Sequence, residues 1–244
     1  MPVYRNEATL RALYERLVRT LGPLTQQYRL RFVVDASPDS SFEILEELRS
    51  TDRRVYVVRL RLNVGQNLAL IRGLAASAGE AMVCLDADLQ DPPEAIPSLL
   101  ERLGDGVSAV FAGRRGRYQS PMRQLSSRAY KTGLHILSGG RLPRDAGLFV
   151  ALDREMRDHI VSHATADSYL PAIMALSRRR MISIPVHRAC SPVGVSSYSP
   201  VDRLRLGIRG VRCLLGPIAG RSSEPLSAST IGESAAATEG ERGE

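Results

Sequence analysis

Two aspartates separated by one residue, Asp86 and Asp88, have the spacing that most clearly suggests chemistry. They follow an apolar run, and side chains alternate along an extended backbone, so both carboxylates would face the same side where that strand ends. Two carboxylates held close together repel each other unless a cation lies between them. A small number of oxygen ligands suits Mg²⁺ or Mn²⁺ that is also bound to a diphosphate, and Gln90 can supply another oxygen. Taken alone, the Asp-x-Asp pattern favours a solvated turn that caps the next helix, because turns are rich in aspartate.

The segments around this pattern alternate between short β-rich runs and amphipathic stretches. The predicted strands cover residues 29–34, 55–60, 81–85 and 107–111, and the predicted helices cover residues 7–21, 42–48, 67–78 and 93–103. This alternation predicts an α/β fold with a doubly wound, mostly parallel sheet flanked by helices. Ligands of such sheets bind at the carboxyl ends of the strands. The residues predicted at those ends are Asp35, Asn63, Asp86, Asp88 and Gly113.

The second half of the chain is less regular. It predicts a mixture of loop and helix over residues 114–140, strands over residues 148–152 and 181–186, and helices over residues 154–161 and 169–177. We expect one domain over residues 1–200. Residues 201–219 alternate arginine with aliphatic side chains and predict a basic amphipathic helix, whereas residues 220–244 are rich in Ser, Ala, Glu and Gly and predict disorder.

The overall charge points to an anionic partner. A net charge of +7 and a pI near 9.8 suit nucleic acid, an acidic membrane surface or a phosphorylated small molecule. No nucleic-acid module is recognisable, and only 5% of residues are aromatic, so the bases of a nucleic acid would find few stacking platforms. We expect neither a membrane span nor a cleavable signal peptide. Three widely spaced cysteines and histidines without zinc-site spacing suit a reducing cytoplasm and no structural zinc.

Four segments favour the metal-site interpretation of the Asp-x-Asp pattern over the solvated turn, because they occur in order and each stands at a predicted strand end. They cover residues 2–10, 33–41, 63–67 and 86–94. Together they resemble the family 2 glycosyltransferases of the GT-A fold, especially the branch that makes dolichyl- or polyprenyl-phosphate sugars. Asp-Ala-Asp-Leu-Gln-Asp-Pro-Pro-Glu, which starts at Asp86, is close to a signature of that branch. The resemblance runs to about residue 215 and is strong up to Gly113.

The resemblance implies a role for individual residues. The implied donor nucleotide-binding residues come from the start of the chain and from the ends of the strands predicted over residues 29–34 and 81–85: Pro2, Val3, Tyr4, Asn6, Glu7, Asp35, Asp86, Ala87 and Asp88. Among them, Asp35 resembles the carboxylate that binds the base. The implied ligands of Mg²⁺ or Mn²⁺ are Asp86, Asp88 and Gln90, and the implied catalytic residues are Asp86, Asp88 and Arg114, the last on the donor phosphates. Arg123 and Arg128 fall where the family carries arginines toward the acceptor phosphate, although a solvated helix face explains them equally well.

The chain also departs from the family pattern on the donor side. Relatives have about five more strand residues before the first Pro, so either the native start lies upstream or a central strand is incomplete. Arg5-Asn6 stands where relatives have Asn-Glu, which leaves either Asn6 or Glu7 for the nucleotide contact. Val34 replaces the first of two usual aspartates, and Asp35 keeps the second.

Acceptor-side departures are larger. Leu148 and Val150 replace the charged residues of a Gly-Asp-Phe-Arg motif, and serines replace both basic residues of an Arg-x-x-Gly-x-Ser-Lys-Tyr loop over residues 191–198. A lipid phosphate is already anionic and needs no strong base, whereas a hydroxyl acceptor does. The missing aspartate therefore favours a phosphate acceptor, although Asp145 could serve as a base.

The favoured hypothesis is an inverting hexosyltransferase that moves a sugar from a GDP-mannose- or UDP-glucose-type donor to polyprenyl or dolichyl phosphate. Residues 201–219 would then lie on the cytoplasmic membrane surface, or else pack on the domain. One alternative is a soluble glycosyltransferase with a natural-product or other small-molecule acceptor. The other alternative is a non-catalytic protein that binds partners through its basic surface.

Overall fold

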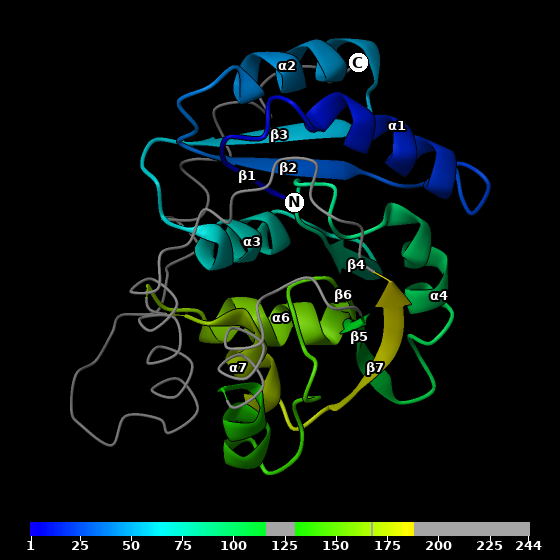
Figure 1. Cartoon of the computed structure of the whole chain (residues 1–244), viewed down its shortest axis with the longest axis vertical. Coiled ribbons are helices and arrows are strands. Elements are labelled where there is room, and N and C mark those ends of the chain that lie inside the picture. Colours follow the sequence, from blue (N-terminus) through cyan, green and yellow to red (C-terminus); the bar gives the residue numbers. More distant parts are fainter. Residues whose placement is uncertain (116–129, 167, 188–244) are drawn as a thin grey trace.

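The N-terminal part of the chain builds a parallel sheet, sheet A, in the order β1-β2-β3. In this computed structural model, which describes residues 1–115, 130–166 and 168–187, its strands are β1 (Pro2–Val3), β2 (Leu30–Asp35) and β3 (Val55–Leu60). Helices α1 (Leu10–Leu21) and α2 (Ser41–Thr51) cover one face, and α3 (Gln66–Ala75) covers the other (Figure 1). Alternation of apolar residues explains both layers. Phe32 and Val34 pack toward α1 and α2, while Val33 packs toward α3.

The second sheet, sheet B, has the order β4-β6-β5-β7. Its strands are β4 (Ala81–Cys84), β5 (Val107–Arg115), β6 (Val150–Asp153) and β7 (Arg180–His187). Strand β6 runs antiparallel to both neighbours, whereas β5 and β7 are parallel. The α/β prediction is confirmed, with one parallel and one mixed sheet in place of a single sheet.

Helices complete the second half. A short 3₁₀ turn, η1 (Pro93–Ala95), leads into α4 (Ile96–Leu100), and α6 (Arg154–His163) and α7 (Leu170–Leu176) follow later; residues 130–137 are also helical. One apolar core lies between α1, α4 and the sheets, and a second joins α3, α6 and α7 to sheet B. The helix predicted over residues 93–103 is shorter than expected: the 3₁₀ turn comes first, Pro97 lies in the first turn of α4, and the helix ends at Leu100.

Strand β1 is as short as the sequence suggested. Its two residues pair with β2, and no described residue joins β1 to β4 by a strand pairing. The Met1 amino group donates to the Arg31 carbonyl oxygen at 2.9 Å, and burial lowers its pKa. Within the described ranges, no continuous hydrogen-bonded ladder therefore joins the two sheets.

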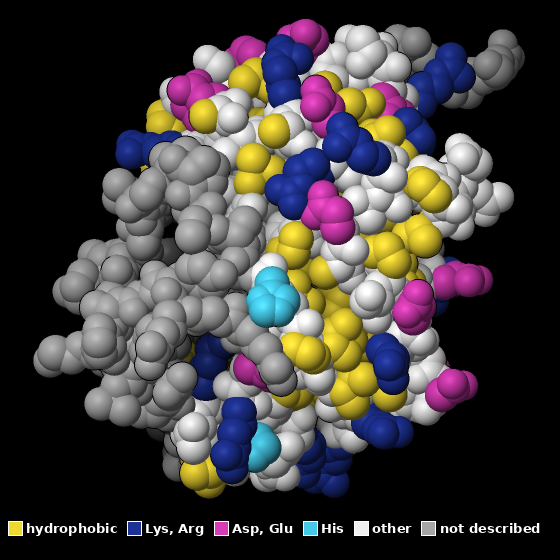
Figure 2. All heavy atoms as spheres, turned by 45° about the vertical axis from the view of Figure 1, so that its right-hand side comes forward, with side chains coloured by type: hydrophobic (Ala, Val, Ile, Leu, Met, Phe, Trp, Pro, Cys, Tyr) yellow, Lys and Arg dark blue, Asp and Glu magenta, His cyan; other side chains and the backbone are white. Residues whose placement is uncertain are grey.

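Several predictions concern residues outside the described ranges. They are the roles of Arg123 and Arg128, the loop over residues 191–198, the amphipathic helix over residues 201–219 and the disorder over residues 220–244. Within the described ranges, no helix has both the length and the apolar character needed to span a membrane. On the face seen in Figure 2, basic and acidic side chains are interspersed over the upper part, so that part carries no single basic patch.

Candidate functional site

The loop after β1 and the loop after β2 are tied together by hydrogen bonds. The main-chain N–H groups of Arg5 and Glu7 donate to Ser37 Oγ at 2.7 Å and to Asp39 Oδ2 at 3.1 Å. In return, the Ser40 N–H donates to Glu7 Oε2 at 3.0 Å. Burial raises the pKa of Asp39, but hydrogen bonds from serine hydroxyls and main-chain amides outweigh it, so this pKa lies below its ordinary value. The Glu7 carboxylate thus helps to hold the loop after β2, in addition to any contact that it makes with a ligand.

Tyr4 and Asn6 lie in the first of these loops. Asn6 Oδ1 accepts the Tyr4 N–H at 2.9 Å, and the Tyr4 ring is 37% exposed beneath the Arg5 guanidinium. Pro2 and Val3, in contrast, are buried in β1. The exposed ring is therefore the part of the predicted nucleoside-flanking segment that a ligand can reach.

Asp35 ends β2 and is 3% exposed. Its two carboxylate oxygens accept the main-chain N–H groups of Val64 at 2.7 Å and Gly65 at 2.8 Å, and Asn63 Nδ2 donates to the Asp35 carbonyl oxygen. The carboxylate predicted to bind a base thus also fixes the loop between β3 and α3.

The Asp-x-Asp pair follows β4, with Asp86 buried and Asp88 half-buried in the turn beyond it. Leu85 and Ala87 are buried in the core beside α1 and α4, whereas Cys84 belongs to the core on the opposite face of sheet B. Asp86, between Leu85 and Ala87, therefore points away from α1 and toward the face that carries α3. Gln66 Nε2, from the first turn of α3, donates to Asp86 Oδ1 at 2.5 Å.

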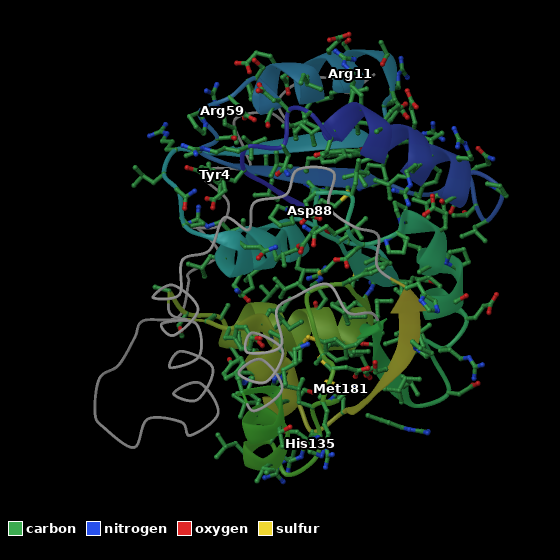
Figure 3. The ribbon with its side chains drawn as sticks, in the orientation of Figure 1. Tyr4, Arg11, Arg59, Asp88, His135 and Met181 are labelled. Atoms are coloured by element: carbon green, nitrogen blue, oxygen red, sulfur yellow. The ribbon has the colours of Figure 1, made fainter. Side chains whose placement is uncertain are left out.

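Asp88 is half-buried and lies near the centre of the molecule in Figure 3, far from His135 and Met181. Its Oδ1 accepts the Gln90 N–H at 3.0 Å, and Leu89 between them has a positive φ of 61°. The Gln90 main chain thus shapes the turn that follows the pair.

This donor set fits a divalent cation that is shared with a diphosphate. Across the described ranges, no group of three or more His, Cys, Asp or Glu side chains could hold a metal ion alone. Asp86 and Asp88 supply hard oxygen ligands, and a Mg²⁺ or Mn²⁺ ion here would take its remaining ligands from phosphate and water. The neighbouring Cys84 contributes no thiolate, because burial raises its pKa to about 11.

Non-glycine residues with positive φ mark three of the strand ends. Arg5, Ala36 and Leu89 follow β1, β2 and β4 at φ values of 56°, 51° and 61°. Each such residue costs on the order of 1 kcal/mol, and such strain clusters at ligand sites. Two other residues of this kind, Asp105 and Arg178, lie in turns away from these loops. Hydrogen bonds connect the loops that follow β1, β2 and β4, and these loops together are the candidate site.

Sequence reasoning named the strand ends but missed two contacts there. The sequence pattern places Gln66 in the segment 63–67 without a role, whereas in the structure its amide donates to Asp86. Thr9 was also missed: its hydroxyl donates to the Ala87 carbonyl oxygen at 2.6 Å and joins α1 to the Asp-x-Asp loop. Arg114 lies in β5, paired with Val186, and its side chain is outside the described part.

Comparison with known proteins supports a sugar-transfer site. A family model described as glycosyl transferase family 2 matches residues 1–160. The undecaprenyl-phosphate 4-deoxy-4-formamido-L-arabinose transferases of Proteus mirabilis and Aeromonas hydrophila are 31% and 29% identical to the chain over 215 residues. These alignments cover 88% of this chain and 66% of each relative, so the chain spans just under two thirds of their length.

Solved structures show the same fold. The mannosyltransferase PcManGT from Pyrobaculum calidifontis, in complex with GDP-Man and Mn²⁺, has a TM-score of 0.61 at 18% identity, covering 96% of this chain and 67% of its own. Glucosyl-3-phosphoglycerate synthase from Mycobacterium tuberculosis, in complex with Mn²⁺, UDP-glucose and phosphoglyceric acid, has a TM-score of 0.58 at 22% identity, covering 88% and 76%.

Proposed function

This chain belongs to glycosyl transferase family 2, and we propose that it moves a sugar from a nucleotide-sugar donor to a polyprenyl or dolichyl phosphate, with Mg²⁺ or Mn²⁺ as cofactor. The observation that carries the proposal is the Asp-x-Asp pair at the carboxyl end of β4. Asp86 accepts a hydrogen bond from Gln66 there, and Asp88 lies two residues further on, in the turn after the strand; the loops fixed by Asp35 and Asp39 follow β2.

The donor half of the proposal assigns the work to described residues. The exposed Tyr4 ring and the loop after β2 would hold the nucleoside, and Gln66 would orient Asp86 toward the diphosphate. Asp86 and Asp88 would hold the divalent ion, with Gln90 as a further oxygen. When bound, such an ion neutralises charge that develops on a leaving nucleoside diphosphate. Inversion by direct displacement, as the family implies, then needs only an acceptor oxygen on the far side of the sugar.

The acceptor half of the proposal depends on the relatives. Both formamido-arabinose transferases carry undecaprenyl phosphate in their names, and a lipid phosphate supplies an anionic oxygen without a strong base. Arg114, Arg123 and Arg128 would meet the donor and acceptor phosphates. The chain would then work at the cytoplasmic face of a membrane as a peripheral protein, with residues 201–219 against the lipid headgroups.

A soluble acceptor is the second candidate. Leu148 and Val150 lack the charges of the Gly-Asp-Phe-Arg motif, and in the structure Val150 is a fully buried residue of β6. A buried valine cannot contact an acceptor phosphate as an arginine at that position would. This observation favours a changed acceptor.

One experiment tests the function. The full chain is incubated with Mn²⁺ or Mg²⁺, undecaprenyl phosphate and radiolabelled UDP-glucose, GDP-mannose or a nucleotide-linked 4-deoxy-4-formamido-arabinose, and lipid-extractable label is counted. We expect metal-dependent transfer with one donor. Transfer to water or to a small alcohol without transfer to the lipid favours the soluble acceptor. A folded sample that turns over none of these donors contradicts the proposal.

A further inference from the structure

An unpartnered carboxylate lies at the end of β5, away from the Asp-x-Asp pair. Asp145 is half-buried, and in the described part of the chain no side chain or amide donates to its carboxylate. Among the described residues, Asp145 accepts a hydrogen bond only through its main-chain oxygen, from Lys131 Nζ at 3.4 Å. An unused acceptor at this edge of the sheet differs from Asp35 and Asp39, whose oxygens are occupied by the protein itself.

Gly113 leaves room for the Asp145 carboxylate because it has no side chain. A Cβ atom built on Gly113 would lie 1.9 Å from Asp145 Oδ2, so any other residue at position 113 would displace the carboxylate. The same Cβ atom would lie 2.5 Å from Ser183 Oγ, which is buried and has no hydrogen-bond partner among the described residues. The Asp145 carboxylate therefore packs directly against the main chain of Gly113.

The register of sheet B places this carboxylate relative to the donor site. Cys84 and Phe111 both pair with Val150, so β4 and β5 are in step on either side of β6 (Figure 1). Asp86 and Gly113 each stand two residues beyond that row, at the same edge. Two strand spacings separate them, or about 10 Å.

Asp86 and Asp145 also share a face of the sheet. Cys84 and Phe111 point into the core beside α3, α6 and α7, and alternation gives Asp86 and the missing side chain of Gly113 the same direction. The Asp86 and Asp145 carboxylates thus lie along one face of sheet B. Asp86 belongs to the site suited to a diphosphate, and Asp145 offers an acceptor for hydrogen bonds.

We propose that Asp145 accepts hydrogen bonds from hydroxyl groups of the transferred sugar and so helps to select the donor. This role rests on the proposed function. The hexose of UDP-glucose or GDP-mannose is neutral, is rich in O–H donors and is attached directly to the diphosphate. A lipid phosphate, in contrast, is repelled by a carboxylate, so Asp145 faces the sugar and not the acceptor phosphate.

The test compares binding of nucleotide-sugar with binding of the bare nucleotide. Calorimetry with Mn²⁺ measures the dissociation constants of UDP, UDP-glucose, GDP and GDP-mannose for the wild type and for Asp145→Ala. A hydrogen bond to a charged group corresponds to roughly 10- to 100-fold in affinity, so we expect Asp145→Ala to weaken nucleotide-sugar binding by about that factor. Binding of UDP or GDP should not change.

Two further variants separate this role from a structural one. Gly113→Ala should reproduce the loss, because the new methyl group displaces the carboxylate, and the double variant should bind no more weakly than either single one. Ser183→Ala is the matched control at the same spot: its buried hydroxyl is unpartnered, so sugar selectivity and folding should be retained.

Several outcomes overturn the proposal. If Asp145→Ala weakens UDP and UDP-glucose equally, the residue is structural. If it leaves both affinities unchanged but lowers the transfer rate with an altered pH profile, Asp145 is a base for the acceptor. If the wild type binds none of the four nucleotides, the proposed function fails and this role fails with it. If the wild type binds them and Asp145→Ala does not weaken binding of the nucleotide-sugars, only the role of Asp145 fails and the proposed function stands.

Discussion

Replacing Asp35 by asparagine should destabilise the protein even without any ligand. Asp35 is buried, and its two carboxylate oxygens accept the N–H groups of Val64 and Gly65. Asparagine keeps the shape but turns one oxygen into an NH₂ group, so one main-chain N–H would face another donor. Losing one charge-assisted bond and leaving a buried donor unpaired costs about 2–4 kcal/mol in the free energy of unfolding.

This free energy converts into a measurable melting temperature. For a domain of this size, each kcal/mol shifts Tm by about 2–4 °C, so Asp35→Asn should lower Tm by between about 4 and 16 °C. Thermal unfolding followed by circular dichroism gives the value, with Asp105→Asn as the same chemical change at an exposed turn.

A Tm within about 2 °C of the wild type would refute the conclusion that Asp35 stabilises the fold by holding the β3–α3 loop. In that case, weakened nucleotide binding by Asp35→Asn would assign the carboxylate to the ligand alone. A large loss of Tm together with weakened binding means that Asp35 acts through the loop it holds, in addition to any contact with a base.

Four further substitutions, at three residues, test the site and the packing that supports it. Asp88→Ala should abolish Mn²⁺-dependent binding of UDP or GDP in calorimetry with little change in Tm, because Asp88 is only half-buried; intact binding would remove it from the metal site. Gln66→Ala should weaken the same binding by about tenfold, because Asp86 loses the amide that orients it, and Gln66→Glu, which places two carboxylates together, should weaken it more. Hydrogen bonds from Arg54 lower the pKa of Asp52 to about 2, so its stabilising effect is present above pH 4 and lost as the pH falls toward 2. The Tm difference between wild type and Asp52→Asn should therefore shrink from pH 5 to pH 2, and a constant difference would contradict the ion pair.

The donor side could be predicted because its rules are local. The apolar runs that form β2 and β4 can be read from the sequence, so the sequence alone could place Asp35, Asp86 and Asp88 at or just beyond the carboxyl ends of these strands. What this reasoning could not supply is the second partner of each side chain. The Asp35 contacts with Val64 and Gly65, and the Gln66 contact with Asp86, join residues 20 to 30 positions apart.

The second half was harder because its strand order is not local. The apolar run at residues 148–152 predicts a strand, and β6 (Val150–Asp153) lies there, but a hydrophobic pattern does not state that β6 runs antiparallel between β4 and β5. The position of β6 between β4 and β5 brings the segment before Val150, and with it Asp145, into contact with Gly113. The position of Asp145 therefore depends on long-range packing.

The segment over residues 63–67 connects parts of the fold that their strands leave apart. Sheets A and B share no strand pairing within the described residues, yet this segment contacts Asp35 of β2, Asp86 beyond β4 and, through Asn67 Oδ1, the Leu170 N–H at the start of α7. Asn67 is buried, so this last bond cannot be replaced by water without opening the core. Distortion of the segment would therefore move the Asp-x-Asp carboxylate and α7 together. For this reason a substitution at Asn67, which contacts no proposed ligand, should disturb donor binding as well as stability.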